Sequence, residues 1–516
     1  MIIKTEIMPS FYQDSVILMR IAGKLRQRPG VKEAALFMGT PSNHELLGQI
    51  GLSTAEGVKA SANDLIVTIA ADTETVADDT IIAAKELLAE RRQAMEESQE
   101  YRPRTLDSAV RLMPNANLVS ISIPGAYARF EAIKALRRDL HVFLFSDNVP
   151  IEAEVELKQE AVKRGLFCMG PDQGTAYING VGLGFANVVP RGRIGCVSAS
   201  GTGLQAVAAR VSMLGEGISH GIGVGGRDLS RQVGGLMTSF AFEALAQDAA
   251  TEVVILVSKP ICAAVKPKIK EIIQKLKKPV VICCIGTSDF NIDGAISART
   301  LDEAADAAVA VLREQPWQPK CFTEHQVIKR KLSRMKDRDD LAGSRILGLY
   351  TGGTLAYESH LLLEGFLGPV GYNQPESDGH SGLILDLGDD VYTIGRPHPM
   401  IDPQKRTEMI LEMGKRNGAN ILLLDLVLGK GSHENPAEPL AAAVKVIHKR
   451  FVKAGRPFAA LASVIGTEMD PQDMKLQIKQ LQDAEIDVFP SNAEAARFAA
   501  LLVNPGLHNQ FMEHKS

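Results

Sequence analysis

This sequence of 516 residues lacks several features that mark common functional classes. Its six cysteines show no paired C-x-x-C spacing, which argues against a disulfide scaffold and a cysteine-based zinc site. Its 57 basic residues nearly balance 61 acidic ones, so no charge excess suits nucleic acid or an anionic membrane. No apolar run reaches the roughly 18 residues of a membrane span, and the first residues do not resemble an export signal. We therefore expect a cytoplasmic protein with reduced thiols and neither nucleic acid nor membrane as a partner.

Short apolar runs alternate with amphipathic stretches along the chain, a pattern typical of α/β proteins with parallel sheets and crossover helices. Two segments interrupt the alternation, a charged one at 86–104 and one at 315–340 that holds the only tryptophan, and we interpret both as linkers. They leave an N-terminal unit and two larger blocks at about 105–315 and 341–504. The predicted strands lie at 65–70, 118–123, 141–145, 193–197, 253–257, 280–285, 346–350, 421–426 and 458–464.

Each large block contains a strand that runs into a turn of small residues and then into a helix. The turn is SASGTG at 198–203 in the first block and TGGT at 351–354 in the second. Unpaired N–H groups at a helix start, with no bulky side chains nearby, suit a phosphate or a carboxylate. The alternative is that these residues only cap their helices. The predicted phosphate-binding residues of the two turns are Ser198, Ser200, Gly201, Thr202, Gly203, Thr351, Gly352, Gly353 and Thr354.

Two arginines join this predicted site. Arg227 lies in the glycine-rich segment GIGVGGRDL at 221–229, and Arg396 stands between glycine and proline in GRPHP. Arginine in a rigid loop suits bidentate binding of a phosphate or a carboxylate, although a solvated charged loop is the alternative at Arg396. The glycines at 221–226 do not form a full dinucleotide-binding fingerprint, so we do not expect NAD or FAD there.

Three residues are candidates for catalysis. Lys259 follows the strand VVILVSKP at its carboxyl end, where open α/β sheets bind ligands. Asp425 lies inside the apolar run ILLLDLVLG, where a carboxylate requires a partner or a function. His398 is the histidine best suited to act as a general acid or base. Several aspartates lie near His398, but no zinc or EF-hand spacing is present and we predict no metal site.

In order and spacing, MGPDQGTAYI, GRIGCVSASGTGLQ, GIGVGGRDL and KKPVVICCIG resemble the α subunit of succinyl-CoA ligase over about 110–315. The motifs GLYTGGTLAYES, LDLGDD and ILLLDLVLG resemble the ligase domain of the β subunit. Together with FYQDSV, FMGTPSN, LFSDNV, GGRDLSR and YTIGRPHPMIDP, they resemble the FdrA family over nearly the whole chain. This resemblance implies a small α/β domain at 1–100, a Rossmann-like CoA-binding-type domain at 105–190, and flavodoxin-like ligase-type domains at 191–315 and 341–504.

The sequence departs from the ligase pattern at the phosphate relay. The α subunit of the ligase carries its phosphohistidine in a Gly-His-Ala-Gly loop, whereas the stretch at 287–300, TSDFNIDGAISART, contains no histidine. The glutamate that accompanies that histidine is replaced near Ser258 and Lys259, and no segment resembles an ATP-grasp domain. These differences argue against an ADP-forming ligase that works from this chain alone.

The FdrA resemblance implies a subunit of an oxamate-type carbamoyltransferase of allantoin catabolism. Such a protein uses carbamoyl phosphate as a substrate and acts with other subunits, and we expect it to form a homo-oligomer. In this reading Lys259, Arg227 and Arg396 stabilise phosphate charge while His398 or Asp425 transfers a proton. The alternatives are an acyl-CoA synthetase that binds CoA, and a non-catalytic subunit that senses phosphate or a nucleotide. CoA and nucleotides are less expected as ligands than carbamoyl phosphate.

Overall fold

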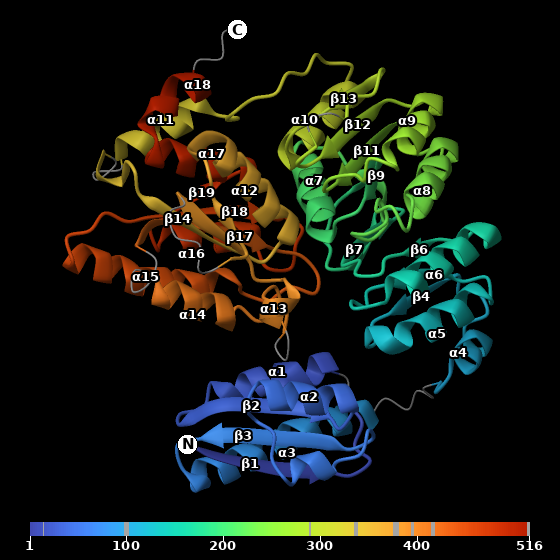
Figure 1. The fold of residues 1–516 in the computed structure, drawn as a ribbon, viewed down its shortest axis with the longest axis vertical. Helices are drawn as coiled ribbons and strands as arrows, with labels where there is room; N and C mark the ends of the chain where they lie inside the picture. Colours follow the sequence, from blue (N-terminus) through green and yellow to red (C-terminus); the bar gives the residue numbers. More distant parts are fainter. Residues whose placement is uncertain are drawn as a thin grey trace. The chain divides into compact units, whose positions relative to one another are not determined.

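A computed structural model describes residues 1–13, 15–96, 103–287, 290–334, 339–374, 381–393, 397–413 and 418–512. Two compact units make up the chain (Figure 1). The first unit is Met1–Arg104 with Asp389–His398, and the second is Thr105–Gly388 with Pro399–Ser516. In the described ranges, no helix combines the length and apolar character that crossing a membrane requires.

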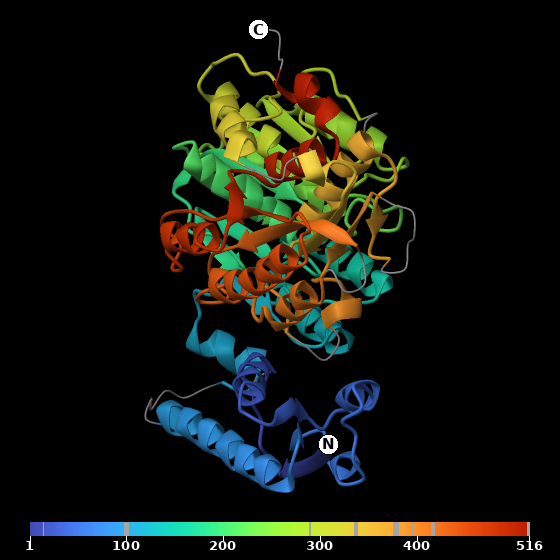
Figure 2. The ribbon, with the colours of Figure 1, turned by 90° about the vertical axis from the view of Figure 1, so that its left-hand side faces the viewer.

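The first unit is an antiparallel sheet with helices on it. The central strand β3 is buried at every residue because its Leu, Ile, Val and Ala side chains meet helices on both faces. The long helix α3, seen side-on in Figure 2, continues through Glu96 because Ala84 and Leu88 pack in the core. The linker predicted at 86–104 is therefore wrong over its first half. The elements of this unit are β1 (Ile2–Met8), α1 (Ser15–Arg26), β2 (Val31–Met38), α2 (Pro41–Gln49), η1 (Gly57–Lys59), β3 (Leu65–Ala71), α3 (Glu74–Glu96) and α13 (Asp390–Thr393).

The second unit begins with a small parallel sheet in the strand order β4-β5-β6. Its helices α5 and α6 contact each other and bury alanine and leucine side chains. The glycine C-cap of α6 at Gly165 has φ +69°, a conformation that glycine adopts without strain. The elements are α4 (Leu106–Leu112), β4 (Leu118–Ile121), α5 (Gly125–Leu136), β5 (His141–Leu144), α6 (Ile151–Arg164) and β6 (Cys168–Met169).

A seven-stranded sheet follows, in the order β13-β12-β11-β9-β10-β7-β8. Strands β9 to β13 are parallel, and the hairpin of β7 and β8 adds an antiparallel edge, so this sheet starts before residue 190. Helices α7 and α10 cover one face, and α8 and α9 cover the other (Figure 1). The elements are β7 (Thr175–Ile178), β8 (Val181–Gly184), β9 (Arg191–Ser198), α7 (Gly201–Met213), β10 (Ile218–Gly223), α8 (Leu236–Gln247), β11 (Val253–Ser258), α9 (Lys266–Lys275), β12 (Val280–Cys284), β13 (Ala295–Ser297) and α10 (Leu301–Leu312).

A six-stranded parallel sheet in the order β15-β16-β14-β17-β18-β19 completes the second unit. The segment at 315–340, predicted as a linker, contains the helix α11, whose Ile328 and Leu332 are buried. The elements are α11 (His325–Arg334), η2 (Asp339–Leu341), β14 (Arg345–Tyr350), α12 (Gly353–Leu367), β15 (Gly371–Tyr372), β16 (Gly382–Asp386), α14 (Gln404–Glu412), β17 (Ala419–Val427), α15 (Ala437–Lys453), β18 (Ala459–Ile465), α16 (Met474–Gln482), β19 (Ile486–Phe489), α17 (Asn492–Val503), η3 (Pro505–Leu507) and α18 (His508–Met512).

The two larger sheets share one apolar core. Helices α7 and α10 of the seven-stranded sheet pack against α12 and α17 of the six-stranded sheet, and buried residues of all four belong to a single cluster. The predicted α/β fold with parallel sheets and a small N-terminal α/β unit is confirmed. Because α7 and α12 each begin directly after a central strand, this packing brings their N-termini together.

Candidate functional site

The two glycine turns predicted from the sequence meet in the structure. Ser200, the N-cap of α7, and Thr354, in the first turn of α12, place their hydroxyl oxygens 2.6 Å apart. A Cβ added to Gly352 would lie 3.1 Å from Cβ of Thr202, so the backbones also approach closely. Both hydroxyls are buried, because Ser200 is 8% and Thr354 3% exposed. Two turns that are about 150 residues apart in sequence therefore form one site.

The turn before α7 uses its hydroxyl groups to shape the backbone. Ser198 Oγ donates to the carbonyl of Ser200 at 2.7 Å, and Ser200 Oγ accepts from the amide of Gly203 at 2.8 Å. In the part of the chain that the structure describes, the amides of Gly201 and Thr202 have no acceptor. These two N–H groups, at the positive end of the helix dipole, are the groups of this turn that can bind an anion.

The turn before α12 already binds a carboxylate of the protein. Asp425 accepts from the amides of Thr351 and Gly352 at 2.9 and 2.8 Å and pairs with Arg406 at 2.8 Å. Burial raises the pKa of Asp425, against the opposing charge of Arg406 and the donors of the turn. These contacts are enough to explain why a carboxylate lies in this apolar strand. A catalytic role for Asp425 stays a prediction.

A second carboxylate lies at the start of α12. The carboxylate of Asp386, at the end of β16, occupies the space that a side chain at Gly353 would fill. Asp386 is 9% exposed, so its charge acts in a largely buried setting. Two acidic side chains therefore lie at the N-terminus of α12, where they oppose the binding of a further anion.

Lys259 lies at the same edge of the seven-stranded sheet as the turn before α7. It follows β11, which pairs with β9 so that Val257 lies opposite Ser198. Lys259 is exposed, and no described carboxylate forms an ion pair with it. Its Nζ lies 5.8 Å from the ring centroid of Tyr357, a residue of α12. Lys259 is thus a cation without an acidic partner, next to the predicted phosphate site.

The side chain of Arg227 contacts α6 and the segment just before it. Its guanidinium donates to the carbonyl of Val149 at 2.7 Å and pairs with Glu154 of α6 at 2.9 Å. The neighbouring Asp228 pairs with the buried Lys158 at 2.8 Å. Burial alone would lower the pKa of Lys158, but the charges of Asp228 and Glu154 outweigh it and raise that pKa. Arg227 therefore connects the glycine segment to α6, and its phosphate-binding role stays a prediction.

Two further candidates come from the segment at 383–403. Arg396 lies outside the described residues. His398 is described and half-buried, and it belongs to the first compact unit, so its catalytic role stays a prediction.

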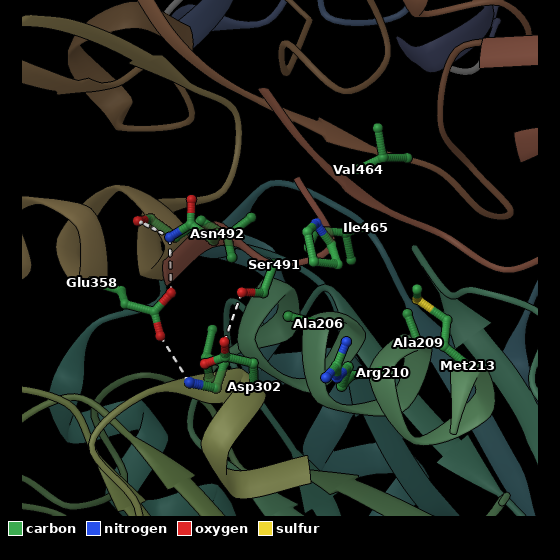
Figure 3. Close-up of a pocket in the computed structure, with 13 residues that line it drawn as sticks. Ala206, Ala209, Arg210, Met213, Asp302, Glu358, Val464, Ile465, Ser491 and Asn492 are labelled. Atoms are coloured by element: carbon green, nitrogen blue, oxygen red, sulfur yellow. Dashed lines mark hydrogen bonds between the residues drawn. The ribbon is translucent and has the colours of Figure 1, made fainter. Parts of the chain in front are cut away.

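Sequence reasoning missed the polar cluster beneath the two turns. Glu358 of α12 accepts from the amide of Leu301 and the side-chain amide of Asn492, each at 2.8 Å (Figure 3). Burial, and next the charge of Asp302, raise the pKa of Glu358 to about 7. A cavity of about 20 Å³, large enough for one water molecule, lies among α7, α10, α12 and α17. A glutamate within the apolar stretch LAYESHLLL was the signal that could have indicated it.

The helix start that follows the first strand of the small sheet is closely packed. The turn between β4 and α5 contains Gly125, but the carbonyls of Asp147 and Asn148 already occupy the space that a side chain would take there. Gly125 therefore lets the backbone of Asp147 and Asn148 approach the start of α5 closely. Binding of CoA at this sheet stays an alternative that these contacts do not decide.

Comparisons with known proteins agree with this architecture. Residues 1–103 match the family model described as "AllF, heavy metal-associated domain", and residues 349–502 match the CoA-ligase family. Residues 1–103 contain no cysteine, and no group of three or more His, Cys, Asp or Glu in the described ranges could hold a metal ion. The N-terminal residues therefore do not fit a bound heavy metal.

Two curated relatives and one solved structure are similar to the chain. Succinate–CoA ligase [ADP-forming] subunit alpha of Methanothermobacter thermautotrophicus is 29% identical over 217 residues, which cover 39% of this chain and 71% of that subunit. ATP citrate lyase from Methanothrix soehngenii, solved with citrate and coenzyme A, covers 80% of this chain and 85% of its own at 14% identity, with a TM-score of 0.34 that carries no further argument. The uncharacterized protein YahF of Escherichia coli K12 is 36% identical over 98% of this chain and 99% of its own length. The chain therefore belongs to the FdrA family of succinyl-CoA-ligase-like proteins.

Proposed function

We propose that this chain is a subunit of a transferase that moves a carbamoyl or similar acyl group between phosphate and an acceptor. The observation that carries the proposal is the contrast between the two turns that meet. At α12 the carboxylates of Asp425 and Asp386 already lie at the helix start, whereas at α7 the amides of Gly201 and Thr202 have no acceptor among the described residues. A phosphate group suits the α7 turn.

Carbamoyl phosphate fits this arrangement as a substrate. In the transfer, the nitrogen of the acceptor forms a bond to the carbamoyl carbon while the bond from that carbon to the bridging oxygen breaks. Phosphate leaves with the electron pair, and the acceptor nitrogen loses its proton. The α7 amides and Lys259 stabilise the charge that develops on the leaving phosphate. The FdrA resemblance favours an amide such as oxamate as the acceptor, in the breakdown of allantoin.

The lack of a relay histidine supports transfer over ligation. The stretch at 287–300 contains no histidine that could carry phosphate from a nucleotide to the acyl group. A substrate that arrives already activated needs no such relay. It needs a site that binds its phosphate, and the α7 turn together with Lys259 suits that need. An acyl-CoA ligase is the second candidate, because residues 349–502 match the CoA-ligase family.

The test is calorimetric titration of the full-length protein with carbamoyl phosphate, with CoA and with ATP and magnesium in separate runs. We expect carbamoyl phosphate to bind and CoA not to bind. Binding of CoA without carbamoyl phosphate would support the ligase instead. Silence with all three ligands would mean that the site depends on a partner subunit or that the chain is a non-catalytic subunit.

A matched pair of variants locates the bound phosphate. Gly201 is the first residue of α7, and the preceding Ser200 is extended (φ −148°, ψ 128°), so proline fits at position 201. Gly201→Pro removes the amide donor, whereas Gly201→Ala adds a Cβ and keeps the donor. We expect the proline variant to bind carbamoyl phosphate about tenfold more weakly than the alanine variant, since one charge-assisted hydrogen bond is lost. Equal affinities would exclude the α7 turn as the phosphate site.

A further inference from the structure

We infer that Tyr357 is a positioning residue that holds Lys259 at the phosphate site, so that the six-stranded half completes a site on the seven-stranded half. This inference rests on the proposed function and extends it to a residue that touches no substrate. Lys259 follows β11 of the seven-stranded sheet, and Tyr357 lies in the second turn of α12. The contact between them therefore joins the two halves next to the turns that meet.

The contact is a cation–π interaction. The ammonium of Lys259 lies 5.8 Å from the centroid of the Tyr357 ring, within the range in which the ring face attracts a cation. Burial, and next the charge of Glu364, raise the pKa of Tyr357, so its phenol stays neutral. A neutral ring orients an ammonium group without cancelling its charge, and the charge stays available to an anion.

The Tyr357 ring is itself held in place from several sides. Its hydroxyl lies 2.9 Å from where a Cβ of Gly286 would be, and Gly286 follows β12, the strand next to β11. On α12 and β15, the rings of His360 and Tyr372 lie 6.4 and 5.9 Å from it, centroid to centroid. A ring fixed in this way presents one face to Lys259 and limits the positions that the flexible lysine side chain adopts.

A second lysine of this protein shows what a purely structural contact looks like. Lys331 lies 5.0 Å from the ring centroid of Phe489, and it also forms an ion pair with Asp487 at 2.6 Å. Its charge is compensated within the protein. Lys259 has the ring contact without a described carboxylate, so its charge is not compensated within the described protein and stays available to an anionic ligand.

The test compares Tyr357→Leu, which removes the ring, with Tyr357→Phe, which keeps the ring and removes only the hydroxyl. Inorganic phosphate and carbamoyl phosphate serve as probes in calorimetric titrations of the full-length protein. We expect the leucine variant to bind each probe about three- to fivefold more weakly and the phenylalanine variant to bind like the wild type. In a Lys259→Ala background, Tyr357→Leu is expected to have no further effect, because the two residues act through one contact. Additive effects of the two substitutions would overturn the inference.

A ligand-free measurement separates this inference from the proposed function. Reductive ¹³C-methylation labels the lysines, and the signal of Lys259 is the one that Lys259→Arg removes. We expect its chemical shift to carry a ring-current contribution that Tyr357→Leu removes and Tyr357→Phe retains. If that shift is present but the wild type binds neither probe, the proposed function is wrong. The contact between Lys259 and Tyr357 is then real, but it does not position Lys259 for a phosphate. If the shift is the same in all three proteins, Tyr357 does not position Lys259. Thermal unfolding of each variant shows whether it folds.

Discussion

The turns before α7 and α12 look alike in sequence and differ in what surrounds them. Both follow a central parallel strand, and both consist of small residues, SASGTG in one turn and TGGT in the other. At the α12 turn Asp425 accepts from the amides of Thr351 and Gly352 and the carboxylate of Asp386 lies against Gly353, whereas no described carboxylate accepts from an amide of the α7 turn. The difference teaches that a glycine turn at a helix start offers an anion site only where the protein supplies no anion of its own.

Among the variants, Asp425→Ala is expected to have the largest effect, because it removes the carboxylate that the α12 turn binds. Asp425→Ala leaves Arg406 buried without a counter-charge and the amides of Thr351 and Gly352 without an acceptor. We expect a loss of about 3–5 kcal/mol in the free energy of unfolding, measured by chemical denaturation. The exposed Asp483 provides the control, since Asp483→Ala removes an aspartate outside any buried network. A loss below about 1 kcal/mol would contradict the anchoring role.

Glu358 lies in α12, below the same turn, and its ionisation should make the stability of the protein depend on pH. Its pKa is about 7 in the folded protein against an ordinary value of 4.5, so between these values the folded state keeps a proton that the unfolded state has lost. Its stabilising contribution is therefore complete below about pH 4.5 and is lost as the pH rises through 7. We expect the free energy of unfolding to fall by about 1.4 kcal/mol per pH unit in this window.

The matched variant is Glu358→Gln, which cannot ionise, and denaturation between pH 5 and 8 checks it. The groups that face Glu358 or share its network are Asp302, Glu303, Arg497, Asn492, Cys283 and Tyr350. We expect the slope of the variant to be shallower than that of the wild type by about one proton. An unchanged slope would assign the pH dependence to another of these groups.

The hydroxyl pair between the two turns gives a smaller effect. Ser200→Ala removes both the cap on the Gly203 amide and the contact to Thr354, so we expect a loss of about 1–2 kcal/mol in the free energy of unfolding. Thr354→Val removes only the contact, and about 1 kcal/mol is expected. Chemical denaturation of both variants measures the difference. Equal losses in the two variants would mean that the hydroxyl pair, and not the cap, accounts for the effect of Ser200→Ala.

Asp386→Asn is expected to have the smallest effect, a change in phosphate affinity that tests the role of the acidic side chains at the start of α12. Asp386→Asn removes one of the two negative charges at the start of this helix while it keeps the size of the side chain. We expect inorganic phosphate to bind about two- to fivefold more tightly, since a carboxylate near the helix start no longer repels it. Calorimetric titration measures the change, with Asp483→Asn as a control that should leave the affinity unchanged. Weaker binding in Asp386→Asn would show that Asp386 supports the ligand.

Much of the fold was readable from local pattern. Apolar runs of strand length predicted β9, β11, β12, β14, β17 and β18 of the two large sheets but not their other strands. The SASGTG and TGGT motifs predicted helix starts at the correct places. The two linker predictions failed in part, because charged segments such as α3 and α11 carry a narrow apolar stripe that packs on a neighbouring element. The motifs also resembled the FdrA family, and the full-length match to YahF agrees with that resemblance.

The sequence by itself determined the α/β class, the family and the two glycine turns, because each depends on residues that are neighbours in the chain. Only the tertiary structure decided that the turns meet, that Asp425 and Asp386 already lie at one of them, and that Tyr357 lies beside Lys259. The first and third facts depend on the packing of α7 and α10 against α12 and α17, and the second on the pairing of β14 with β16 and β17. Contacts between residues that lie far apart in the chain follow from how apolar faces are buried together, and no local spacing in the sequence specifies them.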